Sequence, residues 1–245
     1  MTIMVTQQTA GTPISDIKDT IMKRTPLKDR ALPNYSHSEE VFNMTTHIVG
    51  GAIGVVATVL CVIMAAWHHS VWGIVSGAIF GATMIVLYAI SSIYHGLSHK
   101  LYAKKVLQVI DHCSIFILIA GTYTPYTLVT LREVNPVVGW VIFGVVWGFA
   151  ALGILLNSID IKKYSIFSMV CYLGMGWCIL MYIKPTVTAL GFGGSMLLLL
   201  GGVAYTIGAV LYGIGHKKKW FHSIFHIFVC IGSLLHFLSI LLYVM

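Results

Sequence analysis

The sequence is short of charged residues. Only 9% of its 245 residues are charged, whereas an ordinary soluble domain carries about 25%. Hydrophobic residues make up 58% of the chain, and the mean hydropathy is +0.88. Too few polar residues remain to cover the surface of a soluble globule of this size. The composition excludes a soluble enzyme, a nucleic-acid-binding protein and a disordered chain, and it indicates an integral membrane protein with one domain.

The cysteines form no recognisable pattern, and the N-terminal segment does not resemble a signal peptide. The five cysteines are odd in number, lie in apolar runs and form no CxxC pair, so we expect reduced thiols and no disulfide framework. Residues 1–40 contain no apolar stretch of the kind found in a cleavable signal peptide. We therefore expect the first hydrophobic span to act as the targeting signal and to remain in the protein.

What the chain does contain is a series of long apolar runs without the alternating pattern of barrel strands. Seven of them can cross about 30 Å of hydrocarbon as helices. The predicted spans are residues 43–67, 71–97, 108–131, 136–157, 164–183, 190–215 and 221–244. The predicted fold is an all-α membrane protein, a seven-transmembrane helix bundle comprising residues 42–245, preceded by a polar cytoplasmic tail at 1–41.

The distribution of basic residues predicts the orientation of this bundle. Of 15 Lys and Arg residues, all but Arg132 and Lys184 fall in the tail or in the loops after the second, fourth and sixth spans. Basic residues concentrate on the cytoplasmic side of membrane proteins. We therefore expect the N-terminus inside, the C-terminus outside, and a location in the cell membrane.

Glycines recur every fourth residue on the first two spans: Gly50 and Gly54 on the first, and Gly73, Gly77 and Gly81 on the second. Small residues at this spacing let membrane helices approach closely. They indicate either a homo-oligomer interface or close packing within one bundle. We favour packing within the bundle, because seven helices need many close crossings.

One acidic residue, Asp111, falls inside a predicted span. A carboxylate there costs up to about 2.5–3.5 kcal/mol, so we expect it to have a partner. The alternative is a side chain that extends to the interface or pairs with a nearby lysine.

Three histidines share the depth of Asp111. At about 1.5 Å per helical residue, His95, His222, His226 and Asp111 lie roughly 4.5–10.5 Å beyond the nearest lysine of the cytoplasmic loops. The four-residue spacing of His222 and His226 places them on one helical face, as in two-histidine metal sites. Three histidines predict a tetrahedral zinc site with one open position, where Asp111 can bind the metal water or act as general base. Ser91, one turn before His95, can support the site from a second layer.

The remaining polar residues of the spans are interpreted one by one, and two of them keep two interpretations each. His47 matches the depth of the cluster and is either a spare ligand or a supporting residue, whereas His236, about 25 Å deep, is expected to be a packed, hydrogen-bonded histidine. His112, adjacent to Asp111, is expected to point elsewhere on the helix. The hydroxyls of residues 121–125 either line a cavity or satisfy the backbone around a kink at Pro125.

Together these residues resemble the hemolysin III branch of the progestin and adipoQ receptor superfamily. The matching motifs are Glu40-x2-Asn43-x3-His47, Ser91-Ser92-x-Tyr94-His95, Asp111-His112, Ala120-Gly121-Thr122-Tyr123-Thr124-Pro125, Gly201-Gly202-x2-Tyr205 and His222-x3-His226. The resemblance implies seven helices and an intramembrane zinc near the cytoplasmic face. It also implies zinc ligation by His95, His222 and His226, with Asp111 reached through water.

Three functions follow from these residues and the resemblance. The first is a zinc-dependent hydrolase of a membrane lipid, with an amide bond suggested by adiponectin-receptor and ceramidase relatives, and a role in membrane fluidity suggested by the bacterial branch. The second is a hemolysin or pore-forming protein. The third is a membrane-state sensor or receptor with a structural zinc. A retinal pump is excluded, because residues 221–245 hold no lysine.

Overall fold

The computed structural model describes residues 24–215 and 218–245, and every regular element within these ranges is helical. The elements are η1 (Leu27–Asp29), α2 (His37–Trp67), α3 (Val71–Gly96), α4 (Tyr102–Pro125), η2 (Tyr126–Leu131), α5 (Arg132–Val134), α6 (Pro136–Asp160), α7 (Ser165–Trp177), η3 (Cys178–Tyr182), α8 (Ile183–Gly215) and α9 (Phe221–Tyr243). Residues 1–23 of the predicted tail, and Lys217 of the basic loop, lie outside the described residues.

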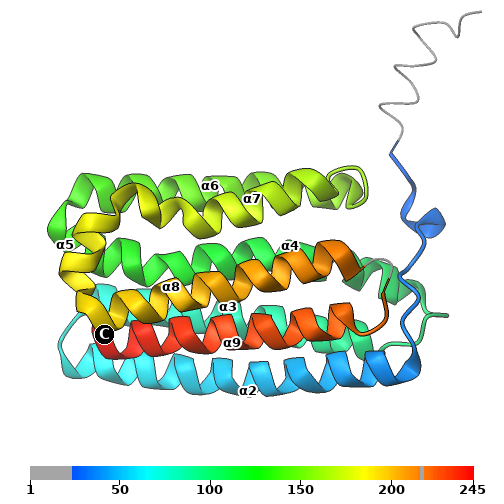
Figure 1. Cartoon of the computed structure of the whole chain (residues 1–245), viewed down its shortest axis with the longest axis horizontal. Coiled ribbons are helices and arrows are strands. Elements are labelled where there is room, and N and C mark those ends of the chain that lie inside the picture. Colours follow the sequence, from blue (N-terminus) through cyan, green and yellow to red (C-terminus); the bar gives the residue numbers. More distant parts are fainter. Residues whose placement is uncertain (1–23, 216–217) are drawn as a thin grey trace, which may run out of the picture.

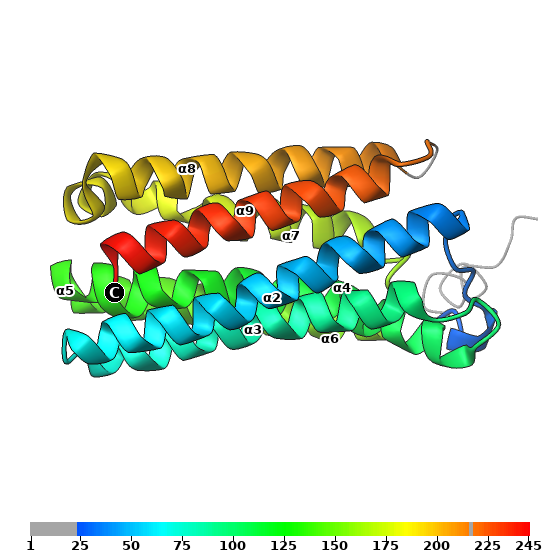
Figure 2. The same cartoon turned by 90° about the horizontal axis from the view of Figure 1, so that it is seen from below.

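The long helices lie side by side along one axis (Figure 1). The entry to α2 and the connections after α3, α6 and α8 gather at one end of the bundle, and the C-terminus and α5 lie at the other (Figure 1). Figure 2 shows α9 lying between α8 and α2. The lysine-bearing connections that the sequence assigned to one side of the membrane therefore do share one end of the fold.

Within residues 24–215 and 218–245, six helical segments are long and apolar enough to cross a membrane, whereas the sequence predicted seven spans. The difference arises in Ser165–Gly215, which counts as one segment of 51 residues and contains both the predicted fifth and sixth spans. Gly191, inside α8, has a left-handed φ of 64°, a conformation that only glycine adopts without strain. Figure 1 shows α7 and α8 running in opposite directions. The described chain is thus an all-helical membrane bundle with six qualifying apolar segments.

Both glycine stripes lie in the α2–α3 contact, and each faces larger residues of the other helix. A Cβ added to Gly54 would lie 3.2 Å from side-chain atoms of Met84, and one added to Gly77 would lie 3.1 Å from Cys61. A Cβ at Gly81 would overlap Thr58. Packing within one bundle, the favoured interpretation of the stripes, is therefore confirmed.

Pro125 ends α4, and the chain continues as the π-helix η2. Proline cannot donate a backbone hydrogen bond, and threonine hydroxyls bond to backbone carbonyls around it. Thr122 donates to the Leu118 carbonyl at 2.8 Å, and Thr124 donates to the Ala120 carbonyl at 2.8 Å. Thr122 and Tyr123 also line a cavity, so the hydroxyl-bearing residues of this segment both bond to backbone carbonyls and form part of a cavity wall.

The first long helix begins earlier than predicted. Ser36 and Glu39 form a capping box, which satisfies free amides at the helix start. Consequently α2 begins at His37, six residues before the predicted start at 43, and Glu40 becomes part of the helix. A carboxylate oxygen of Glu39 also accepts the Trp220 backbone N–H at 2.6 Å, which ties the start of α9 to α2.

Candidate metal centre

Three histidines from two helices meet at the end of the bundle that carries the lysine-bearing connections. His95 is the penultimate residue of α3, and His222 and His226 lie in the first two turns of α9. The Nε2 atoms of His222 and His95 are 3.4 Å apart, and those of His226 and His222 are 3.0 Å apart. Their ligand nitrogens all lie within 4.8 Å of one another. The cluster can therefore hold a metal ion.

Glu40 lies behind this cluster and contacts His95. Its Oε2 atom is 2.5 Å from His95 Nδ1, and its Oε1 atom accepts hydrogen bonds from Lys104 Nζ at 2.7 Å and His99 Nε2 at 2.8 Å. A carboxylate that contacts one ring nitrogen of a neutral histidine accepts a hydrogen bond from it, so that nitrogen carries the proton. The other ring nitrogen then carries the lone pair. In His95 that lone pair is on Nε2, which faces the other two histidines.

Asp111 and Ser91 line the same cavity as His222 and His226. Asp111 does not belong to the group of three nitrogens. Its Oδ2 atom is 3.6 Å from Nδ1 of His112. Ser91 is buried, one turn before His95 on α3.

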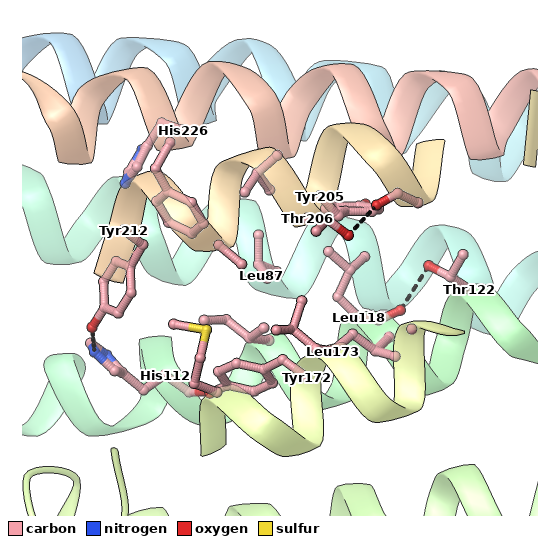
Figure 3. A pocket seen from close by; sticks show the side chains of 18 of the residues that line it. Leu87, His112, Leu118, Thr122, Tyr172, Leu173, Tyr205, Thr206, Tyr212 and His226 are labelled. Atoms are coloured by element: carbon pink, nitrogen blue, oxygen red, sulfur yellow. Dashed lines mark hydrogen bonds between the residues drawn. The ribbon is translucent and has the colours of Figure 1, made fainter. Parts of the chain in front are cut away.

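His112 lines the cavity beside Asp111, although the sequence analysis placed it elsewhere on the helix. Its Nδ1 donates to the Gln108 carbonyl at 2.9 Å. Nε2 is then free to accept the hydroxyl of Tyr212 at 3.1 Å, and Figure 3 shows Tyr212 of α8 pointing to His112 of α4. The hydrogen bond therefore joins α4 to α8 at the cavity wall, where the Tyr212 ring lies 5.9 Å from that of His222, centroid to centroid.

His47 reaches the cluster without joining the three nitrogens. Its ring stacks on that of His226, with centroids 3.7 Å apart and planes inclined by 17°. It is buried, and among the described residues neither ring nitrogen has a hydrogen-bond partner. Its contact with the cluster is therefore through the face of the ring.

A cavity of about 140 Å³ opens beside the histidines. Most of its lining is apolar or aromatic, from α4, α7, α8 and α9, and Figure 3 shows Leu118, Leu173 and Tyr172 on its walls. The lining includes both His222 and His236, and fourteen helical residues span about 21 Å. The cavity therefore extends beyond one leaflet of an approximately 30 Å hydrocarbon core.

The segment before α2 covers the cluster. The Tyr35 ring stacks on His222, with centroids 4.7 Å apart and planes inclined by 14°. Burial, with a smaller contribution from Tyr212, raises the pKa of Tyr35, so its hydroxyl stays protonated. Arg30 Nη2 donates to the Ile159 carbonyl at 2.6 Å, which anchors this segment to the end of α6.

His236 fits its prediction as a packed histidine. It is buried, and its Nε2 donates to the Leu198 carbonyl at 3.1 Å.

Sequence reasoning missed three neighbours of the cluster: Glu40, Lys104 and Tyr35. Glu40 was assigned to the tail because of its charge and Lys104 was counted as a loop marker. The Glu40-x2-Asn43-x3-His47 motif was the one signal that could have placed the glutamate at the site.

The fold and the cluster define a class: a multi-pass helical protein of the cell membrane with three histidines gathered at one end of the bundle. Residues 35–237 match the family described as Haemolysin-III related, and the chain belongs to that family.

Comparison with individual proteins agrees with this assignment. The chain is 38% identical over 209 residues to the Hemolysin-3 homolog of Bacillus subtilis (strain 168), covering 85% of this chain and 96% of that protein. It is 35% identical over 207 residues to Hemolysin-3 of Bacillus cereus, covering 84% and 92%. A more distant relative is the Adiponectin receptor protein of Drosophila melanogaster, 25% identical over 207 residues, covering 67% of this chain and 41% of that protein.

Proposed function

We propose that this protein is a zinc-dependent hydrolase that cleaves an amide-type bond in a membrane lipid and thereby contributes to the homeostasis of membrane lipids and fluidity. The observation that carries the proposal is a group of three histidine nitrogens beside a long apolar cavity inside a membrane protein. Ligand cavities combine an apolar lining with a few convergent polar groups. A lipid chain fits the lining, and the reacting group would lie at the histidines.

The histidine geometry fits zinc. Zn–N bonds of about 2.0–2.1 Å in a tetrahedron separate ligand nitrogens by about 3.3–3.4 Å, close to the observed 3.0 and 3.4 Å. Imidazole nitrogens this close either share a proton or direct their lone pairs at a common cation. The donor set is nitrogen only, which suits zinc better than magnesium or calcium. When bound, zinc would supply Lewis-acid activation of a water molecule and a carbonyl.

The chain itself would bind the substrate and move the proton. The apolar walls hold the hydrocarbon chain, and Tyr35 limits access of bulk water from the end of the bundle. Asp111 is the carboxylate on the cavity wall, so it would accept the proton of the attacking water and pass it to the leaving amine. Ser91 would hold a water or the substrate carbonyl by a hydrogen bond.

For topology we propose seven crossings, with the N-terminus inside, the C-terminus outside, and the cytoplasmic tail leading into α2. The proposal is supported by the opposite directions of α7 and α8 and by the common end of the lysine-bearing connections (Figure 1). A reporter after Met245 should be extracytoplasmic, and one at the N-terminus should be cytoplasmic. A cytoplasmic C-terminal reporter would contradict the orientation.

The names of the Bacillus relatives favour a second function, hemolysis. A pore predicts leakage of dye from vesicles by purified protein without any change in their lipids. A hydrolase predicts lipid turnover, with any leakage following it. A membrane-state sensor with structural zinc predicts metal binding without turnover.

The deciding experiment is Asp111→Asn in the reconstituted full chain. We expect the variant to keep its zinc, because three imidazoles remain, and to lose hydrolysis of a panel of ceramides, acyl amides and phospholipids, because an amide cannot accept the proton. No turnover of any lipid by the wild type, with an in vivo phenotype that survives Asp111→Asn, would favour the sensor.

A further inference from the structure

A buried ion pair lies behind the histidine cluster. Lys104 of α4 has a fully buried side chain, and its Nζ donates to Glu40 Oε1 at 2.7 Å and to the Leu97 carbonyl at 2.8 Å. Glu40 of α2 is itself buried, and its other oxygen contacts His95 of α3 at 2.5 Å. Three helices thus converge on one carboxylate.

Burying this ion pair costs desolvation free energy, so joining the helices does not by itself explain it. Desolvation of two charges can exceed their mutual attraction, and buried ion pairs are weak evidence for stability. The carboxylate has a different partner set on each oxygen, which suggests another role. Among the described residues, Oε1 accepts hydrogen bonds from Lys104 and His99, whereas Oε2 contacts His95. The lysine therefore fixes the carboxylate in the position from which it orients the imidazole.

We propose that Glu40, held by Lys104, is a positioning residue that fixes the tautomer and ring orientation of His95 and so sets the affinity of the three-histidine cluster for a metal ion. The inference rests on the proposed zinc site and extends it to residues outside the ligand set. Partners of ligating histidines commonly contribute 10–100-fold, to order of magnitude, in metal affinity.

The alternative is a purely structural ion pair, and two double variants separate the two roles. Glu40→Ala with Lys104→Met removes both charges and the acceptor for His95. Glu40→Gln with Lys104→Met also removes both charges, yet it keeps an oxygen for the His95 Nδ1 proton. Removing the charges together avoids the unpaired buried charge that a single substitution would leave.

The experiment measures Zn²⁺ and Co²⁺ affinity of the purified full chain by competition with a chelator, together with the visible absorption spectrum of bound Co²⁺. We expect the alanine double variant to lose roughly 10–100-fold in affinity and to change the Co²⁺ spectrum. The glutamine double variant should bind more tightly than the alanine double variant and recover part of the wild-type spectrum, because its amide oxygen still accepts the His95 Nδ1 proton although Lys104 no longer holds it. Glu133→Ala, which removes an exposed carboxylate outside the cluster, should leave both unchanged.

Equal affinities in the wild type and both double variants would overturn the positioning role and leave the proposed hydrolase standing. Equally weak binding by both double variants would also overturn it, because only the charge would then matter. Metal binding with the expected pattern but no lipid turnover would refute the hydrolase and support the role of Glu40. A wild type that binds no metal would refute both.

Discussion

Replacing His47 by phenylalanine tests which of two stacked imidazoles is a metal ligand. The two rings lie 3.7 Å apart, centroid to centroid, and only His226 belongs to the three-nitrogen group. Phenylalanine keeps the flat ring against His226. The change in metal affinity is therefore bounded by the stacking term of about 0.5–1.5 kcal/mol, which is at most about tenfold. We expect His47→Phe to keep its full metal content.

The stability of this variant is a second, independent readout. Neither ring nitrogen of His47 has a hydrogen-bond partner among the described residues. Replacing an unsatisfied buried polar group by an apolar one of similar shape is neutral or stabilising. The melting temperature of the metal-free variant should therefore equal or exceed that of the wild type.

The assay is metal content after dialysis and chelator competition, with His226→Phe as the matched control on the other half of the stack. The control should lose the metal, because a ligand nitrogen is gone. Loss of metal from His47→Phe to the same degree would refute the geometry and make His47 a ligand.

Two further predictions concern packing and access. Gly81→Ala should lower the free energy of unfolding by about 1–3 kcal/mol, because the new Cβ overlaps Thr58. The control Gly144→Ala should leave it unchanged, because a Cβ there has nothing within 4 Å. Equal stabilities of the two variants in detergent would contradict the α2–α3 contact. Tyr35→Ala should speed the removal of bound metal by a water-soluble chelator roughly 2–10-fold, because the ring stacked on His222 is lost. Tyr35→Phe should match the wild-type rate, and identical rates for both variants would show that the ring does not limit access.

The histidine cluster could be predicted from the sequence because the rise per residue of a helix is constant, so residue numbers give depths in the membrane. His95, His222 and His226 lie in segments whose ends are marked by lysines, and a rise of about 1.5 Å per residue put them in one layer. The structure brings these three together. Asp111 was placed at the same level and Ser91 one helical turn away as a supporting residue, and both line the adjoining cavity.

Depth alone could not give the rotation of a side chain about its helix. His112 was expected to turn away from Asp111, yet Tyr212 bonds to it at the cavity wall. Glu40 was read as part of the tail because charge argues against a membrane span. In the fold its carboxylate pairs with Lys104, and the two residues are 64 positions apart in the chain. Pairing over such a distance leaves no local pattern.

The number of crossings depends on the stretch that joins α7 to the main part of α8, which includes η3 and Gly191. The seven predicted spans required a break between 183 and 190, whereas the helical segment Ser165–Gly215 is continuous by length and hydropathy. The left-handed Gly191 lies beside the predicted break. Lys184 and Pro185 lie in the predicted break, so the sequence divides this segment in two although its length and hydropathy qualify it as one.

The most direct test of the central claim is the zinc content of the purified protein. We expect about one zinc per chain in the wild type. The double variant His222→Ala and His226→Ala should lose it. His236→Ala should keep it, because the His236 imidazole of the wild type bonds to a backbone carbonyl and not to the metal. Equal zinc in the wild type and the double variant would contradict a metal centre at the three histidines.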